Sequence, residues 1–150
     1  MDRHKRAIAI FLILRNKAGE YLLQRRANTG YMDGHYDFGA TGHLEADESI
    51  EQCAVREAKE EIGLVINPRD LKLVRVTQTN IFGSAYVGFY FLCETWQGSP
   101  SICEPEKCDD LDWFKPDNLP NKLSNGVRIM QLTDFRDEFE FFYSDSNEPL

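Results

Sequence analysis

The sequence contains no Cys-x-x-Cys pair and no compact disulfide framework, and although Cys103 and Cys108 could join histidines on zinc, the histidines are distant in the sequence. Its four cysteines stand at positions 53, 93, 103 and 108, and no zinc-binding spacing joins them to the three histidines. Scattered cysteines of this kind are typical of reduced thiols. We therefore expect a cytoplasmic protein without a structural zinc ion.

Positive charge is also scarce in this chain. Lysine and arginine together number 17 against 25 aspartates and glutamates, which gives a net charge of −8. Such a chain has no broad basic surface for a nucleic acid or an anionic membrane. A phosphorylated substrate would meet a repulsive field, so metal ions and local arginines would be needed to hold it. Long RNA is therefore the least expected partner.

Hydrophobic runs of membrane-spanning length are absent from the sequence. The apolar stretch at residues 7–14 follows a short basic segment, as in a signal peptide. No small-residue cleavage site follows it, and Arg15 ends the run too early for a membrane span. We interpret this stretch as a buried strand and expect no membrane partner.

One helix is predicted with both of its ends marked, over residues 50–62. Ser49 is a suitable N-cap, Gln52 follows three residues later as in a capping box, and Gly63 supplies a C-terminal stop. Apolar residues recur every four positions and can pack against a sheet. They are Ile50, Ala54, Ala58 and Ile62, with Val55 at the edge of the stripe.

Three glutamates, Glu57, Glu60 and Glu61, lie on one turn of this predicted helix beside the apolar stripe. Like charges so close together repel, and bound cations are the usual way to offset that repulsion. Mg²⁺ prefers oxygen ligands and is commonly completed by substrate phosphates, which suits a carboxylate cluster without histidine or cysteine. Taken alone, however, Glu60 and Glu61 would more often be part of a solvated acidic face.

A fixed spacing around these glutamates changes that interpretation. Its seven fixed positions are Gly42, Glu48, Arg56, Glu57, Glu60, Glu61 and Gly63. With residue frequencies of roughly 0.05 to 0.07, they would match by chance on the order of once in 10^8 starting points. The run resembles the signature of the Nudix hydrolases at every fixed position, and Ala58 and Leu64 fit its two apolar positions.

The resemblance implies an α+β fold of the Nudix type, an αβα sandwich in which a mixed central sheet lies between helices. Residues 1–150 would form this single domain. By the same resemblance Glu57, Glu60 and Glu61 are the metal ligands, and one of them or a nearby carboxylate deprotonates water. The expected ion is Mg²⁺, for which Mn²⁺ can substitute.

The resemblance also gives supporting roles to three residues of the signature. Arg56 and Glu48 would pair with the ligands and orient them, and Gly42 would let the backbone approach the phosphates. The loop departs from many relatives by having Ala-Thr-Gly at residues 40–42 in place of Pro-Gly-Gly, and by having Asp47 where glycine is common. Aspartate tolerates a positive φ, so we expect the loop to form and the metal site to be unaffected.

Three candidates lie outside the signature. Arg25 resembles a substrate-contacting arginine of many relatives, with a surface cation as the alternative. Glu106, with Glu104 as second choice, resembles an acidic loop residue that reaches the metal cluster as general base; a solvated loop glutamate is the alternative. Asn125 lies near a base-reading position of some relatives, and equally suits a helix cap.

Aromatic candidates for stacking on a base, which more often pack in a core, are Tyr31, Tyr36, Phe38 and Phe82.

The rest of the chain predicts a sheet and a second helix. Residues 7–15 and 20–25 are predicted as a hairpin of central strands, and further strands are predicted within 36–45, 71–77, 85–96 and 111–114. Residues 27–35 read as a loop. Helical spacing of apolar residues predicts a second helix over 125–141 on the other face of the sheet, followed by a frayed tail at 144–150.

The predicted function is Mg²⁺-dependent hydrolysis of a nucleoside diphosphate linked to another group, X. The products would be a nucleoside monophosphate plus pyrophosphate or phospho-X, and the partner a small nucleotide or diphosphate. A homodimer is reasonable by family resemblance. One alternative is a non-catalytic nucleotide sensor, although such proteins commonly lose the ligand carboxylates. Another is an isopentenyl diphosphate isomerase, which needs a cysteine shortly before the helix; no cysteine precedes Cys53. The sequence does not identify the substrate.

Overall fold

The computed structural model describes residues 3–80 and 85–145, which form eight strands, two α-helices and two short 3₁₀ helices. In chain order the elements are β1 (Ala7–Leu14), β2 (Tyr21–Arg26), β3 (Tyr36–Phe38), β4 (Ala40–His43), α1 (Ile50–Ile62), η1 (Pro68–Asp70), β5 (Lys72–Asn80), β6 (Tyr86–Cys93), β7 (Cys108–Phe114), α2 (Asn125–Arg128), η2 (Leu132–Asp134) and β8 (Glu140–Asp145). The strands predicted within 36–45, 71–77, 85–96 and 111–114 are all confirmed, and residues 27–35 form a loop.

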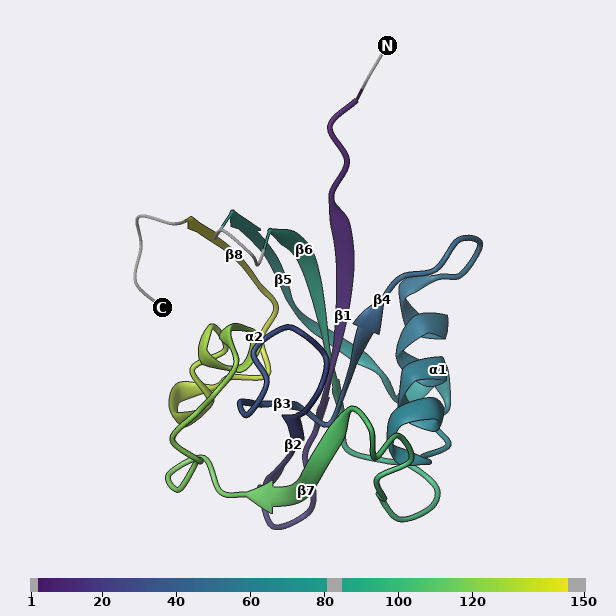
Figure 1. Ribbon diagram of the computed structural model, residues 1–150, viewed down its shortest axis with the longest axis vertical. Helices are drawn as coiled ribbons and strands as arrows, with labels where there is room; N and C mark the ends of the chain where they lie inside the picture. The colour runs from purple at the N-terminus through teal and green to yellow at the C-terminus, as the bar shows by residue number, and fades with distance from the viewer. Residues whose placement is uncertain (1–2, 81–84, 146–150) are drawn as a thin grey trace.

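The strands form two sheets, which Figure 1 shows between α1 on one side and α2 on the other. The larger sheet has the order β4-β1-β6-β5-β8, with parallel pairing of β1 with β6 and of β5 with β8. The smaller sheet is antiparallel and has the order β3-β2-β7. The predicted sandwich with a mixed sheet is confirmed.

Strand β1 lies inside the larger sheet, between β4 and β6, and both of its faces are buried. Ile10, Leu12 and Leu14 pack in the core cluster that includes the buried face of α1. The alternate residues, Ala9, Phe11 and Ile13, belong to a second cluster, which α2 and η2 cover. A strand buried on both faces reads as a continuous apolar run, which is why residues 7–14 look like a membrane segment in the sequence. Within the described residues, no helix is long and apolar enough to cross a membrane.

The ends of α1 are as predicted. The Ser49 side chain accepts a hydrogen bond from the Gln52 backbone N–H, and the Gln52 side chain accepts one from the Ser49 backbone in return. Gly63 adopts a left-handed φ of 73° and ends the helix. An N-cap of this kind contributes about 1 kcal/mol. Together the two caps set the first and last residues of the helix that carries the glutamates.

The predicted hairpin of β1 and β2 is wrong. Apart from a single bridge between Arg15 and Tyr21, the two strands belong to different sheets. The turn at 16–19 forms as expected, with Gly19 donating to the carbonyl of Asn16. However, β4 and β6 already occupy the two edges of β1, so β2 pairs with β3 and β7 instead.

The predicted helix over residues 125–141 is also wrong. Only Asn125–Arg128 is α-helical, and the chain then turns at Gln131, whose φ is 49°. A bidentate pair between Arg15 and Asp137 holds the following segment, which continues as β8 at the edge of the larger sheet. Ser144 and Asp145, expected in a frayed tail, are part of β8, and Ser144 is buried. Residues 146–150 lie outside the described residues, as does Phe82.

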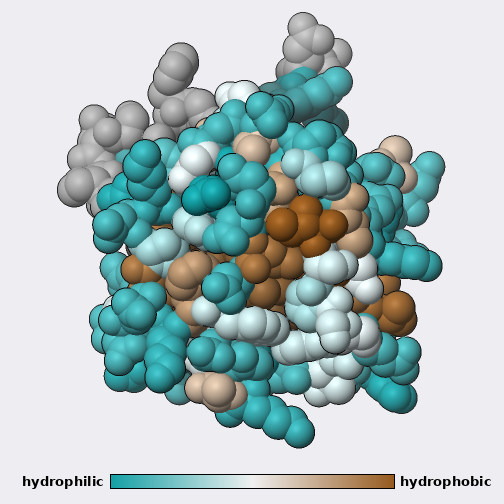
Figure 2. Space-filling model, turned by 60° about the horizontal axis from the view of Figure 1, so that its bottom comes forward, coloured by the Kyte–Doolittle hydropathy of each residue, from teal (hydrophilic) through white to brown (hydrophobic). Residues whose placement is uncertain are grey.

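The surface is hydrophilic over most of the face that Figure 2 presents, which is the lower side of Figure 1. Apolar side chains gather near the middle of this face and polar ones surround them. Larger exposed aromatics occur elsewhere, at the edge of the sheet, where Phe139, Phe141 and Tyr143 are exposed. The described cysteines are all free thiols, as predicted.

Candidate active site

A cavity of about 520 Å³ lies where the two sheets meet. Its wall draws on β1, β2, β3, β4, α1 and β6, on the loop before β7 and on the first turn of α2. Thr41, Gly42, Glu61 and Glu104 form one group in this wall, where Thr41 donates a hydrogen bond to Glu61 and the charge of Glu104 acts on Glu61; together with the adjacent Glu57 we call them the carboxylate end. Gln24, Asp37 and Tyr86 form a second group, in which Gln24 and Asp37 are cross-strand partners, and we call it the ring end. The two ends differ in chemistry, so we describe them in turn.

Arg56 organises the glutamates beside the carboxylate end. Its guanidinium forms two hydrogen bonds with Glu48, Nη2 to Oε1 at 2.8 Å and Nε to Oε2 at 3.0 Å. The same group contacts Glu57 at 2.8 Å and Glu60 at 3.2 Å. The hydrogen bonds from Arg56 lower the pKa of Glu48 to about 2, so Glu48 stays ionised and holds the arginine in place. The structure thus brings together Arg56, Glu48, Glu57 and Glu60.

Gly42 makes room for Glu57. A methyl group at Gly42 would come within 2.2 Å of the Glu57 carboxyl group, which no ordinary contact allows. The family resemblance implies that this glycine lets the backbone approach phosphates. The structure shows in addition that the Glu57 carboxyl group occupies the space beside it. The neighbouring Asp47 has a φ of 65°, so the aspartate accepts the backbone conformation for which glycine is usual.

Glu61 lies between α1 and β4, where its Oε2 accepts a hydrogen bond of 2.8 Å from the Thr41 backbone N–H. Burial raises the pKa of Glu61 well above its usual value, and the nearby charges of Glu57 and Glu104 raise it further. Burial raises the pKa of Glu57 in the same way, although Arg56 opposes the effect. Two half-buried carboxylates and a third from the facing loop therefore share one small region, and their mutual repulsion favours a cation.

The donor set at this end consists of oxygen atoms, as a hard divalent ion requires. In the described parts of the chain, no three acidic, histidine or cysteine side chains are already close enough together to hold an ion. The geometry gives the reason: Glu57 and Glu60 are turned toward Arg56, and Glu60 remains 54% exposed, while Glu61 is turned toward Thr41. Rotamer changes on one helical turn would bring these oxygens together.

Three candidates from the sequence are not part of the cavity wall formed by the described residues. Arg25 points to the other face of β2 and pairs with Asp109 at 2.6 Å. Glu106 is exposed, and its carbonyl accepts a hydrogen bond from Asn28. Asn125 begins α2, where Ser124 is the cap. Neighbouring residues line the cavity instead. Arg26 does so in place of Arg25, and Glu104 does so in place of Glu106.

The reason for the change from Arg25 to Arg26 is the pleat of β2. Side chains alternate between the two faces of a strand, so Gln24 and Arg26 face the cavity and Arg25 does not. A register shift between Arg25 and Arg26 in the pairing with β7 occurs at the same point. The sequence shows the two adjacent arginines, but it does not show which of their side chains faces the cavity.

Sequence reasoning also missed the ring end. Asp37 is buried within β3 between two aromatic residues, and Gln24 is buried at the end of the apolar part of β2. The signal was available, because a charged or amide side chain inside a short apolar strand is unusual and commonly has a function. Of the aromatic stacking candidates, Tyr31 lines the cavity, whereas Phe38 is fully buried in the core.

The chain is similar to known proteins of one family. Residues 4–132 match the model of the NUDIX domain. The chain is 30% identical over 120 residues to a NAD-capped RNA hydrolase NudC of Stutzerimonas stutzeri, covering 80% of this chain and 41% of that protein. It is 32% identical over 88 residues to the 8-oxo-dGTP diphosphatase of Escherichia coli, covering 59% of this chain and 66% of that protein. The chain therefore spans about two fifths of the length of the NudC protein and two thirds of the diphosphatase.

Solved structures show the same fold. A MutT NUDIX hydrolase from Burkholderia pseudomallei superposes with a TM-score of 0.78 at 24% identity, covering 89% of this chain and all of that chain. A MutT protein from Bacillus halodurans superposes with a TM-score of 0.71 at 22% identity, covering 92% and 89% of the two chains. At these identities the likeness concerns the arrangement of strands and helices.

Proposed function

Because the chain belongs to the Nudix family, we propose that it hydrolyses the pyrophosphate bond of a nucleoside diphosphate linked to a group X. The substrate would be a small nucleotide, and the products a nucleoside monophosphate plus pyrophosphate or phospho-X. The relatives named as 8-oxo-dGTP diphosphatase and NAD-capped RNA hydrolase both fit this reaction class. The net charge of −8 favours a small molecule over long RNA.

The observation that carries the proposal is the carboxylate end of the cavity. Glu57 and Glu61 come from one helical turn and Glu104 comes from the facing loop, and the charge of Glu104 raises the pKa of both Glu57 and Glu61. A solvated acidic surface would not be buried against Gly42 and Thr41 in this way. The arrangement suits a site whose charge is balanced only when cation and phosphates are bound.

We assign the metal-binding role to Glu57, Glu60 and Glu61, with Mg²⁺ as the expected ion and Mn²⁺ as a substitute. When bound, the ion neutralises charge on the phosphate oxygens during the displacement. Arg56 and Glu48 hold the glutamates in position through the hydrogen bonds described above. This role is one of orientation, because Arg56 contacts Glu57 and Glu60 and is itself held by two hydrogen bonds to Glu48.

In the proposed reaction, a water oxygen forms a bond to one phosphorus and the bridging P–O bond breaks. The proton of the water passes to a carboxylate at the carboxylate end, and the leaving phosphate departs with the bridging oxygen. Glu104 replaces Glu106 as the loop candidate for that proton transfer, since Glu104 faces Glu57 and Glu61. Lys107, whose Nζ lies 3.7 Å from Glu104, replaces Arg25 as the cation available to phosphate along the cavity wall.

The proposal is tested by incubating the protein with GTP, dGTP, ATP, NAD and ADP-ribose in Mg²⁺ and measuring monophosphate, pyrophosphate and phosphate. At least one compound should yield a monophosphate, and chelation of the metal should abolish the reaction. Mn²⁺ should restore it. If nucleotides bind in the presence of Mg²⁺ and return intact, the protein is a sensor and the proposed hydrolysis is wrong.

A further inference from the structure

The ring end of the cavity presents two buried acceptors side by side. Gln24 in β2 and Asp37 in β3 are direct partners in the antiparallel pairing of these strands. Side chains of such partners lie on the same face of the sheet, with Cβ atoms about 5 Å apart. Both residues line the cavity, and they are only 6% and 3% exposed.

Gln24 has a fixed orientation. Its Nε2 donates to the carbonyl of Phe38 at 3.0 Å and to that of Gly39 at 3.1 Å, which uses both amide hydrogens. The amide oxygen is therefore the end directed away from these two carbonyls. No donor to it is seen among residues 3–80 and 85–145, and it is not among their fully enclosed, unpaired polar atoms. Gln24 thus presents its amide oxygen to the cavity as a hydrogen-bond acceptor.

Asp37 retains accepting capacity although it has protein partners. Its carboxylate accepts from the Phe38 backbone N–H at 2.8 Å and from Arg26 Nη1 at 3.4 Å, and Ser124 donates its hydroxyl. Burial raises the pKa of Asp37, and Arg26 with these hydrogen bonds opposes that shift. An ionised carboxylate offers about four acceptor sites, and the contact with Arg26 is long, so a ligand donor can be accommodated.

A rigid loop supplies an aromatic wall beside these acceptors. Within residues 27–35, the Asp33 carboxylate accepts hydrogen bonds from the backbone N–H groups of Thr29 and Gly30 and from the Thr29 hydroxyl. Four residues of the loop have positive φ: Asn28, Gly30, Met32 and Gly34. This closely wound loop presents Tyr31 to the cavity.

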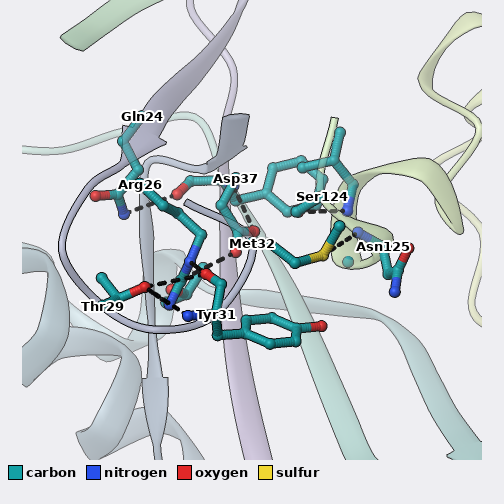
Figure 3. A network of polar contacts seen from close by, with 12 residues as sticks. Gln24, Arg26, Thr29, Tyr31, Met32, Asp37, Ser124 and Asn125 are labelled. Carbon is teal, nitrogen blue, oxygen red and sulfur yellow. Dashed lines mark hydrogen bonds and ion pairs between the residues drawn. The ribbon is translucent and has the colours of Figure 1, made fainter. Parts of the chain in front are cut away.

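Arg26 connects the loop to the ring end, as Figure 3 shows by its dashed contacts to Thr29, Tyr31 and Asp37. Its Nε donates to the carbonyl of Tyr31 at 2.7 Å, and its guanidinium lies 5.3 Å from the centre of the Tyr31 ring. Tyr86 also lines the cavity and contacts Phe11 at a centroid distance of 5.7 Å. Flat aromatic surfaces and two acceptors therefore surround the same space.

We propose that the ring end selects a planar heterocycle that carries two neighbouring N–H donors, one paired with Asp37 and the other with Gln24. A 2-aminopurin-6-one, the guanine type of ring, has this pattern in its ring N–H and its 2-amino group. Adenine places an acceptor nitrogen beside its amino group and would leave a buried acceptor unpaired. Hypoxanthine lacks the 2-amino group. This inference rests on the proposed function, since it names the substrate class of that site.

The test measures binding of GMP, IMP and AMP to the full chain at constant Mg²⁺ by calorimetry, which needs no hydrolysis. GMP should bind about tenfold or more tightly than IMP, since a hydrogen bond to a buried acceptor is worth about 1.4 kcal/mol or more. AMP should bind more weakly than GMP by at least the same factor. Equal affinities for the three nucleotides in the unmodified protein would overturn the inference.

Variants locate the preference. Of Asp37→Asn and Gln24→Ala, the variant that removes the acceptor of the 2-amino group should reduce the preference for GMP over IMP to within about threefold, and the other should weaken binding of GMP and IMP alike. In Asp112→Asn, an exposed aspartate of β7, the preference and both affinities should be unchanged. Thermal melting shows which variants are folded. A folded Asp37→Asn or Gln24→Ala protein that binds GMP as tightly as the unmodified protein would contradict the assignment, as would full preference in both variants.

These outcomes separate the two proposals. Selective binding of GMP without hydrolysis of any nucleotide would retain the ring preference and reject the proposed function. Hydrolysis of guanine and adenine nucleotides with equal kcat/KM and equal product affinity would retain the function and reject the ring preference.

Discussion

The two ends of the cavity differ in how far apart in the chain their residues lie. The carboxylate end is mostly local: Glu57 and Glu61 share a helical turn, and β4 precedes that helix by a short loop. The ring end joins β2, β3, β6 and the first turn of α2, and depends on the register of strand pairs. A reaction common to a family can be carried by a local motif, whereas selection of the ring depends on long-range packing.

The sharpest way to separate the two ends is to remove one charge from the carboxylate end. Glu61→Gln should lower kcat about 1000-fold, because loss of a metal ligand removes several kcal/mol of transition-state stabilisation. The preference for GMP over IMP should persist. Steady-state kinetics at saturating Mg²⁺ measure the effect, with Glu51→Gln at the start of α1 as control. Unchanged turnover by Glu61→Gln would remove the basis of the metal-site assignment.

A steric change tests the same end without altering its charge. The added methyl group in Gly42→Ala would overlap the Glu57 carboxyl group and displace it. We expect kcat to fall about 100-fold, as for misplacement of a catalytic group by about 1 Å. Product binding at the ring end should change little. Full activity in this variant would show that the position of Glu57 does not matter to the reaction.

A smaller effect is expected when the orienting arginine is replaced. Arg56→Lys keeps the charge but loses the paired hydrogen bonds to Glu48. Activity should fall about tenfold, and the Mg²⁺ concentration for half-maximal rate should rise. Titration of Mg²⁺ at fixed substrate measures both values. An unaltered Mg²⁺ dependence would exclude an orienting role.

At the ring end, loosening the loop should affect substrate binding more than chemistry. Asp33→Ala removes the acceptor that joins Thr29 to Gly30, so Tyr31 loses its fixed position. KM should rise about fivefold with kcat nearly unchanged, as for loss of hydrogen bonds worth about 1 kcal/mol. Asp117→Ala, in the turn after β7, is the matched control. A fall in kcat alone would argue that the loop acts on the carboxylate end.

The smallest effect is expected outside both ends, at the pair of Arg15 and Asp137. Hydrogen bonds from Arg15 lower the pKa of Asp137 in the folded protein. A lowered folded pKa stabilises the protein above the unfolded pKa of about 3.9, and this stabilisation is lost as pH falls through the folded pKa. Asp137→Asn should lower the melting temperature by about 2 °C at pH 7, since partly exposed pairs contribute less than about 1 kcal/mol. The difference should shrink as the pH falls below the unfolded pKa and through the lowered pKa of Asp137, and a constant difference would contradict the pairing.

The sequence predicts α1 and its glutamates well because caps, periodicity and spacing are properties of adjacent residues. Prediction from the sequence fails where contacts with distant segments determine the structure. Residues 20–25 could pair with β1 by every local criterion, but β4 and β6 occupy both edges of that strand. Residues 139–143 carry apolar side chains that suit a helix or an edge strand, and pairing with β5 selects the strand.

The same limit explains the site residues. Resemblance to the family favours Arg25, whereas the structure places Arg26 and not Arg25 in the cavity wall. Glu104 and Glu106 differ by two residues in one loop, and the fold turns the first toward Glu61. Asp37 and Gln24 are cross-strand partners, and their spacing along the chain does not reveal this pairing.

The parallel pairing of β1 with β6 has a consequence for how the chain folds. Ala7 pairs with Tyr86, so the most apolar strand of the sheet has no parallel neighbour until more than half of the chain has been synthesised. Helix α1 and β4 lie closer in sequence and can cover part of β1 earlier. Contacts of such long sequence separation slow folding and leave apolar surface exposed in the meantime. Newly made chains should therefore aggregate most readily before β6 has emerged from the ribosome.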